Sequence, residues 1–310
     1  MSRLTRQGFW REAFSVEGAI TPRVLPRVIA FGAIALGVCA AAWLGERTLG
    51  RRLSLDITPH ELAGAALGLL LVMRTNAGYD RWWEARKLWG GFVDCCRNVA
   101  IGGLRYGPDD QAWREQFARW VAAYPHVARH SLRGERPGAE VAGLIGPDRA
   151  AELGEADHMP AFVSARLADL LREGRERLGM EPTFFLQVDR ERALLINNYG
   201  GCERILNTPL PRVYSLKIRH FIALYLMTLP LALLHRAESD WLVPLITMLV
   251  AYPLIALDQI GVELENPFDR NNLSHLPIDG IAATIERNVL ALLRVEAPDA
   301  QGTGAGGTFP

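Results

Sequence analysis

Four long stretches without a charged residue constrain this chain more than any other feature of its sequence. They are Val28–Leu44, Leu62–Met73, Phe221–Leu234 and Trp241–Leu257. As a helix the first stretch reaches about 26 Å, close to the thickness of the hydrocarbon core of a bilayer. The pattern predicts an all-α integral membrane protein with four membrane-spanning helices in two hairpins and a large helical cytosolic region.

The second stretch is short and rich in small residues. Leu62–Met73 spans only about 18 Å as a helix. The preceding residues predict a helix start, with Thr58 as the N-cap, Pro59 at the first helical position and Glu61 completing a capping box. Such a helix suits close packing or the lining of a cavity better than exposure to lipid alone.

Both termini are predicted to lie on the cytoplasmic side. Two hairpins return the chain to the side on which it starts, and arginines flank the first span on that side. The expected segments are an N-terminal cytosolic segment (1–22), a first membrane hairpin with the pore helix (23–73), a cytosolic helical region (74–213), a second membrane hairpin (214–260), a C-terminal cytosolic helix region (261–296) and a disordered tail (297–310). Pro230, Pro244 and Pro253 are expected to kink the second hairpin.

Two apolar stripes predict buried helix faces outside the spans. One stripe consists of Trp82, Ala85, Trp89, Phe92 and Cys96, and the other of Ile278, Ile281, Ile285, Val289 and Leu292. No alternating run is long enough to predict a sheet. Trp82, Trp83 and Trp89 could together form an aromatic binding site. Core packing and anchoring at the membrane interface explain the three tryptophans with fewer assumptions.

The sequence gives no sign of an enzyme, a cofactor or a nucleic-acid partner. It contains no glycine-rich phosphate loop, nucleophile elbow or zinc-protease helix, and its net charge is +0. The four cysteines form no Cys-x-x-Cys pair, so we expect reduced, buried thiols.

Two sets of polar residues leave alternatives open. His126 and His130 lie four residues apart and could share a metal, but two surface or interface histidines are the favoured interpretation. Asp80 and Glu84 could perform acid–base chemistry. Ion pairing with Arg81 and Lys87 is favoured, because those cations are adjacent.

Two separated motifs resemble the signature of the bestrophin family of ion channels. The first is Arg74-Thr75-Asn76-Ala77-Gly78-Tyr79-Asp80-Arg81-Trp82-Trp83-Glu84, and the second is Glu265-Asn266-Pro267-Phe268-Asp269. The resemblance covers about Pro22 to Leu293 and implies a structural role for Arg74, Asp80, Arg81, Trp82, Trp83, Glu84, Asn266, Pro267 and Phe268. It also implies a homopentameric channel, here closer to the bacterial and plant-type members than to the animal ones, and a location in the bacterial inner membrane.

The resemblance implies two constrictions. It places a hydrophobic neck at Thr58, Leu62, Ala66 and Leu70, and a cytosolic constriction at Leu195 or Ile196. From the residues alone, the stripe of Leu62, Ala66 and Leu70 is more simply a packing face, because one protomer cannot enclose a pore with one short helix. Only a cyclic oligomer places such a stripe around an axis.

The expected function is passive conduction of chloride or other monovalent anions across the lipid bilayer. The alternatives are a cation-selective bacterial bestrophin channel and a membrane scaffold without conduction. Animal members bind calcium through an acidic run after the second motif, where this chain has Asp269-Arg270-Asn271-Asn272. One carboxylate beside an arginine is too little charge for a calcium site, so no metal is expected.

Overall fold

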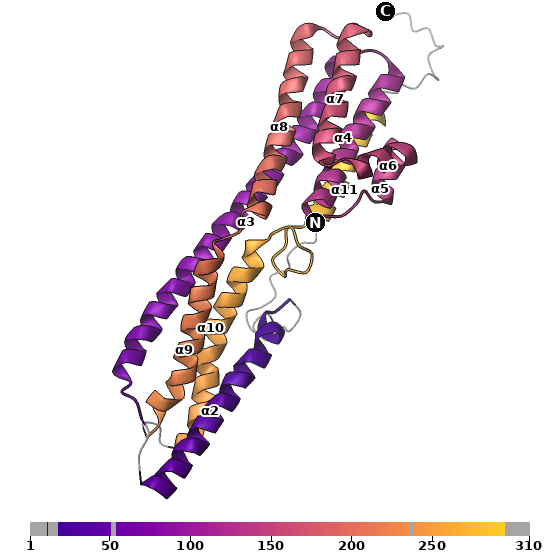
Figure 1. The fold of residues 1–310 in the computed structure, drawn as a ribbon. Coiled ribbons are helices and arrows are strands. Elements are labelled where there is room, and N and C mark those ends of the chain that lie inside the picture. The colour runs from indigo at the N-terminus through magenta and orange to yellow at the C-terminus, as the bar shows by residue number, and fades with distance from the viewer. Residues whose placement is uncertain (1–10, 12–17, 51–53, 236–238, 295–310) are drawn as a thin grey trace, which may run out of the picture. The chain divides into compact units, whose positions relative to one another are not determined.

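The computed structural model describes residue 11 and residues 18–50, 54–235 and 239–294, and all regular elements in these ranges are helices (Figure 1). This confirms the all-α prediction. The predicted disordered tail lies outside the described residues, and so does the predicted N-terminal segment apart from residue 11 and residues 18–22. The chain forms two compact units, unit 1 (Met1–Trp83 and Thr208–His275) and unit 2 (Glu84–Asn207 and Leu276–Pro310). These units are defined by contacts and do not test the membrane boundaries, so the six expected segments remain predictions.

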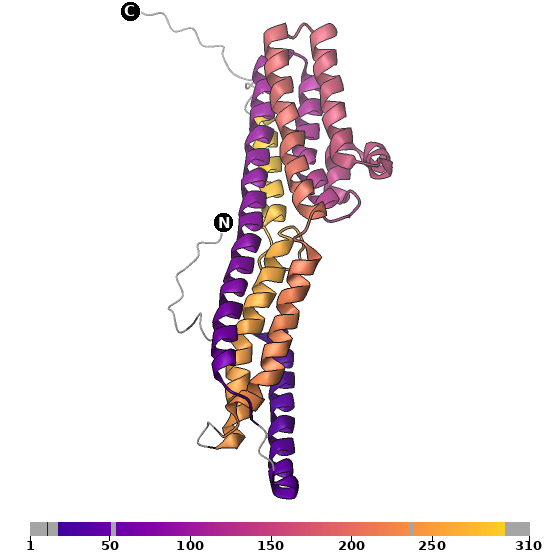
Figure 2. The same cartoon turned by 60° about the vertical axis from the view of Figure 1, so that its left-hand side comes forward.

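Unit 1 is a bundle of long helices. It contains α2 (Thr21–Leu49), the first part of α3 (Thr58–Tyr106), α9 (Arg212–Leu233), the 3-10 turn η1 (Asp240–Leu242) and α10 (Val243–Glu265). Both α2 and α9 pack against α10, and the three lie side by side in Figures 1 and 2. The aliphatic core draws on all four long helices and includes Val24, Val28, Leu67, Leu71, Ile218, Ile222, Leu226, Leu229, Ala251 and Ile255.

Three segments are long and apolar enough to cross a membrane. They are Thr21–Thr48, Arg212–Leu233 and Asp240–Glu265, which correspond to the first, third and fourth predicted spans. The second predicted span is a short apolar part of the 49-residue helix α3. It is too short to meet the same criterion by itself, so a fourth span is not established by length and composition.

Two predictions about helix ends are wrong in detail. Helix α3 begins at Thr58 rather than Pro59, and the carboxylate of Asp56, rather than the hydroxyl of Thr58, accepts a backbone hydrogen bond there (Thr58 N to Asp56 Oδ1, 3.2 Å). The Thr58 hydroxyl itself donates to Asp56 (3.1 Å). Pro244 lies in the first turn of α10, where its missing N–H leaves no bond unmade, whereas Pro230 and Pro253 are inside helices as expected.

Unit 2 packs its helices around α4. Its elements are the second part of α3, α4 (Gln111–Leu132), α5 (Ala139–Ile145), α6 (Pro147–Glu155), α7 (Met159–Glu176), α8 (Pro182–Asn207) and α11 (Ile278–Arg294). Helix α4 contacts α5, α7 and α11, and α7 contacts α8.

The predicted stripes are buried for most of their length in unit 2, but Ile281 and Leu292 are only half-buried, and so is Trp82, which belongs to unit 1. Trp89 and Phe92 stack with their ring centroids 5.4 Å apart, and Ile285 and Val289 are fully buried on α11. All four cysteines are buried and free, as predicted. Burial raises the pKa of Cys202 to about 12, so this cysteine remains a protonated thiol.

The two histidines of α4 are not surface residues, so that part of the sequence interpretation is wrong. His126 and His130 are buried, and each is hydrogen-bonded to a glutamate from another part of the chain. His126 Nε2 lies 2.8 Å from Glu286 of α11, and His130 Nε2 lies 2.7 Å from Glu140 of α5. Within the described ranges, no group of three or more His, Cys, Asp or Glu side chains has the arrangement of a metal site.

This cluster sets the charge states of its members. Burial by itself raises the pKa of Glu140, but its backbone hydrogen bond, the hydrogen bond from His130 and the charge of Arg129 together lower it to about 2. Burial lowers the pKa of His126. The charge of Glu286 and its hydrogen bond oppose this and the charge of Arg129 adds to it, and the net shift is downward. Glu140 therefore stays ionised near neutrality, while the folded state favours a neutral His126.

We expect acid to destabilise unit 2 through His126. Because its folded-state pKa lies below its ordinary value, the unfolded chain gains a proton first as the pH falls, and stability present above about pH 6.5 is lost below it. The unfolding midpoint in detergent should fall between about pH 7.5 and about pH 5.5. The fall should be smaller in His126→Gln. The partly exposed His158→Gln is the control, and equal slopes in all three proteins would contradict the expectation.

Candidate functional site

The first part of α3 carries an apolar surface that unit 1 leaves uncovered. Leu62 is 71% exposed, Leu69 63% and Met73 55%. The opposite side of the helix buries Leu67 and Leu71 in the core. A contiguous apolar surface of this kind requires lipid or another protein chain to cover it.

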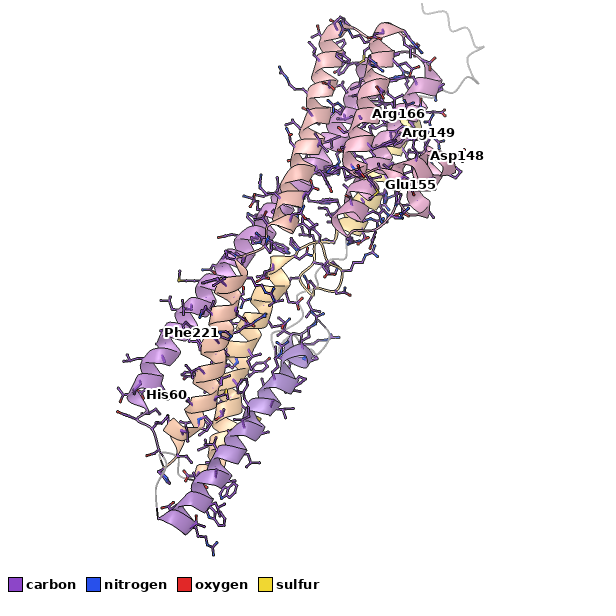
Figure 3. The ribbon with its side chains drawn as sticks, in the orientation of Figure 1. His60, Asp148, Arg149, Glu155, Arg166 and Phe221 are labelled. Carbon is purple, nitrogen blue, oxygen red and sulfur yellow. The ribbon has the colours of Figure 1, made fainter. Side chains whose placement is uncertain are left out.

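A groove of about 340 Å³ runs along one flank of this surface, between α3 and α9. Its lining residues are Pro59, His60, Ala63, Ala66, Leu67 and Leu70 of α3, and Phe221, Leu224, Tyr225 and Thr228 of α9. His60 Nε2 is hydrogen-bonded to Thr228 Oγ1 at 2.9 Å. Figure 3 labels His60 and Phe221 on the two helices. Ala63 and Ala66 have only methyl side chains, which leaves the groove open.

The predicted neck stripe follows the edge of this groove. Residues four apart on a helix drift by about 40° around its axis, so the stripe turns slowly. Ala66 and Leu70 line the groove, while Leu62 lies outside it and is exposed. Leu69 and Val72, on the other flank, are also exposed. The stripe therefore has uncovered apolar surface on both sides, as a helix facing the axis of a ring would have.

A charged cluster terminates this apolar part of α3. Arg74 is 1% exposed and forms an ion pair with Asp258 of α10 and a second, at 3.3 Å, with Glu265. Asp258 also accepts a hydrogen bond from Arg219 Nε of α9 at 3.1 Å. A Cβ on Gly261 would lie 3.2 Å from Arg74 Nε, so the glycine gives the guanidinium room between the helices.

Comparison with known proteins identifies the family of this chain. The model of the family described as Bacterial/Fungal Bestrophin protein matches residues 1–291. The chain belongs to the bacterial and fungal bestrophin family. This confirms the resemblance carried by its two motifs.

Relatives of this bestrophin include named channel proteins. A protein of Mesorhizobium japonicum named voltage-dependent anion channel-forming protein is 33% identical over 294 residues, which is 94% of this chain and 92% of that protein. The protein YneE of Escherichia coli, with the same name, is 32% identical over 76% of each chain. The crystal structure of a bacterial bestrophin homologue from Klebsiella pneumoniae is similar with a TM-score of 0.79 at 24% identity, covering 87% of this chain and 98% of that one. This last similarity supports the fold.

The second bestrophin motif forms a loop whose polar side chains bond to its own backbone. Asn266 Oδ1 accepts from Phe268 N at 3.1 Å, and Phe268 is fully buried. Trp82 of the first motif donates from Nε1 to the carbonyl of Ser274 at 2.7 Å, just beyond this loop. The structure thus joins both motifs in unit 1, through side chains that order the loop after α10.

Two members of the first motif have partners that the sequence did not reveal. Glu84 pairs with Arg204 of α8 at 3.3 Å, and Arg81 donates to the carbonyl of Thr208 at 2.8 Å. The favoured ion pairing of Glu84 therefore extends to another helix, where its partner is Arg204 of α8, which the sequence did not predict. The sequence could not reveal these two partners, Arg204 of α8 and Thr208 just after it, because each lies more than a hundred positions from the residue that it contacts.

The candidates for the cytosolic constriction differ in burial. Leu195 is 0% exposed in the core of unit 2, whereas Ile196 is half-buried. A fully buried side chain does not line a water-filled passage in this conformation, which argues against Leu195. Sequence reasoning missed two exposed leucines of the same helix, Leu186 at 64% and Leu194 at 43% exposure. The run of Phe184, Phe185 and Leu186 could have indicated that Leu186 is exposed, since three consecutive apolar residues of a helix cannot all face one core.

We expect Arg74 to be indispensable for unit 1. Arg74→Ala leaves Asp258 buried without its main partner, a change that typically costs about 3–5 kcal/mol. Arg74→Lys keeps the charge but loses the forked geometry, so a smaller loss is expected. The measurement is thermal unfolding in detergent, together with the yield of folded protein. Arg86→Ala, an exposed arginine of the same helix, is the control. An equal loss in the control and in Arg74→Ala would contradict this role.

Proposed function

We propose that this bestrophin is a homopentameric channel for passive conduction of anions, chloride foremost. The observation that carries the proposal is membership of the bestrophin family together with relatives named voltage-dependent anion channel-forming proteins. Conduction requires no catalytic residue and no cofactor, only a pore of suitable radius and polarity.

The uncovered surface of α3 supports assembly into a ring. In the proposed pentamer Thr58, Leu62, Ala66 and Leu70 of each protomer line the neck. The groove beside Ala66 and the exposed flank at Leu69 are covered by neighbouring protomers. This accounts for apolar residues on both sides of the stripe, which a monomer in water would not tolerate.

The short apolar part of α3 is the proposed fourth span. Neighbouring protomers, rather than lipid, surround it in a ring, so it does not need the length of a lipid-exposed helix. The N-terminus of α3 then faces the outside, where the positive end of its helix dipole attracts anions to the pore mouth. Both termini and unit 2 lie in the cytoplasm, and the membrane is the bacterial inner membrane.

For the cytosolic constriction we propose Ile196, with Leu186 as a second candidate on the same helix. Ile196 is half-buried and Leu186 exposed, so both have surface to present to a passage. The proposal includes no calcium site, because Asp269 Oδ1 accepts hydrogen bonds from Asn271 N (2.9 Å) and Nδ2 (3.1 Å) within its own loop.

One experiment separates the channel from its alternatives. The purified protein is weighed in detergent by native mass spectrometry and then reconstituted in planar bilayers with asymmetric potassium chloride. Five copies and a reversal potential near that of chloride support the proposal. A reversal potential near that of potassium indicates a cation channel, and a pentamer without current indicates a scaffold. Recording with and without a calcium chelator tests the absence of calcium regulation, and a large change would contradict it.

Substitutions in the stripe should change conductance in opposite directions. A narrow apolar ring resists wetting, so Leu62→Ala should raise the current per channel and Ala66→Phe should suppress it. Ala63→Phe is the matched control, since Ala63 lines the groove but lies off the stripe. Overpacking alone costs about 1–3 kcal/mol in either phenylalanine variant. If Ala63→Phe and Ala66→Phe lower stability and current alike, the stripe is a packing face and the pore runs elsewhere.

A further inference from the structure

A second groove of unit 1 combines a charged end with an apolar one. It has a volume of about 400 Å³ and lies between α2, α9 and α10, with no contribution from α3. Its lining residues are Arg27, Ala30, Phe31, Ile34, Arg219, Ile222, Ala223, Ile255 and Asp258. This groove is distinct from the one beside the proposed neck, since it shares no residue with it.

The two arginines lie where the membrane interface has to be. Arg27 is the last residue before the uncharged stretch Val28–Leu44, and Arg219 lies two residues before Phe221–Leu234. Both helices are candidate spans. The guanidinium groups therefore meet the headgroup level of the bilayer, while Phe31, Ile34 and Ile222 continue the groove into the hydrocarbon.

The charges around the groove leave a positive excess. Asp258 is shared between Arg74 and Arg219, Glu263 pairs with Arg23, and Glu265 is the second partner of Arg74. Arg27 donates to the neutral side chain of Gln259 at 3.1 Å and has no carboxylate partner among the described residues. In this network four arginines face three carboxylates, the fourth arginine being Arg27.

We propose that the groove binds an anionic phospholipid of the cytoplasmic leaflet. The phosphate group contacts Arg27 and the outer edge of Arg219, which is half-exposed, and an acyl chain lies along Phe31, Ile34 and Ile255. Asp258 does not oppose the phosphate, because its two oxygens are held by Arg74 and Arg219. Guanidinium–phosphate pairing of this kind is a strong, charge-assisted interaction.

Lipid fits this groove better than a second copy of the chain does. A neighbouring protomer would have to bring carboxylates to the level of Arg27. The acidic residues of α10 nearest that level, Asp258, Glu263 and Glu265, are already paired inside the protomer. The inference rests on membrane insertion of α2, α9 and α10 and does not require conduction, so it can fail or hold independently of the proposed channel activity.

Native mass spectrometry of the full oligomer tests the proposal directly. The delipidated protein is titrated with phosphatidylglycerol, with phosphatidylcholine, and with inorganic phosphate, and bound lipid is counted at each oligomer mass. We expect phosphatidylglycerol to bind in preference to phosphatidylcholine. Removing one interfacial arginine with Arg27→Gln should weaken this binding about fivefold, as expected for one such charge, and Arg27→Lys should restore most of it. Ala30→Leu, which fills the apolar end without changing charge, should weaken it too.

The matched control is Lys217→Gln, an exposed cation of α9 that does not line the groove. Equal weakening by Lys217→Gln and Arg27→Gln would overturn the proposal, since general surface charge would then explain the binding. Equal binding of phosphatidylglycerol and phosphatidylcholine would also overturn the proposal. So would displacement of phosphatidylglycerol by inorganic phosphate at the same concentration as the lipid. A loss of oligomer mass in Arg27→Gln or Ala30→Leu would show that the groove holds a neighbouring protomer instead.

Discussion

The ion pairs of Arg74 are the interaction on which unit 1 depends. An arginine with almost no exposed surface is costly to bury unless its charge is balanced, and here Asp258 and Glu265 of α10 balance it. The pairs connect α3 to α10, and Gly261 leaves room for the guanidinium, since a Cβ there would lie 3.2 Å from Arg74 Nε. They also bring Arg219 of α9 to the shared carboxylate of Asp258. Three helices are thereby held at one level, where the apolar part of α3 ends and its charged part begins.

This arrangement leaves α3 with its apolar face turned outward. Leu67 and Leu71 are buried in the core of unit 1. The opposite face of α3 packs against no other described helix of the unit, so Leu62 and Leu69 remain exposed. In a membrane the same face can meet lipid or copies of itself. The small residues Ala63 and Ala66, and the groove they leave against α9, favour copies of the chain, because close approach of helices is what small side chains permit in a bilayer.

Unit 2 is organised by a different principle. Its centre is aromatic and aliphatic, but buried polar groups of α4 join α5 and α11 to it. Arg129 pairs with both Glu140 and Asp279, and Arg133 adds a second arginine on Asp279 at 2.8 Å. Ion pairs and hydrogen bonds require a defined geometry. They therefore specify which helix faces contact each other more strictly than apolar packing alone does. The two histidines take part in this network as hydrogen-bonding partners of glutamates.

The sequence by itself determined the class, the three helices that are long and apolar enough to span a membrane, the buried parts of the stripes around Trp89 and Ile285, and the family of the chain. Periodicity and hydropathy report which face of a helix is buried and whether it tolerates lipid, so these features could be derived from local residues. Only the tertiary structure decided which residues are partners. Asp258 lies 184 positions from Arg74, and Glu286 lies 160 positions from His126. It also placed Leu195 in the core and gave Arg27 no carboxylate partner among the described residues, because both outcomes depend on how helices distant in the sequence pack against one another.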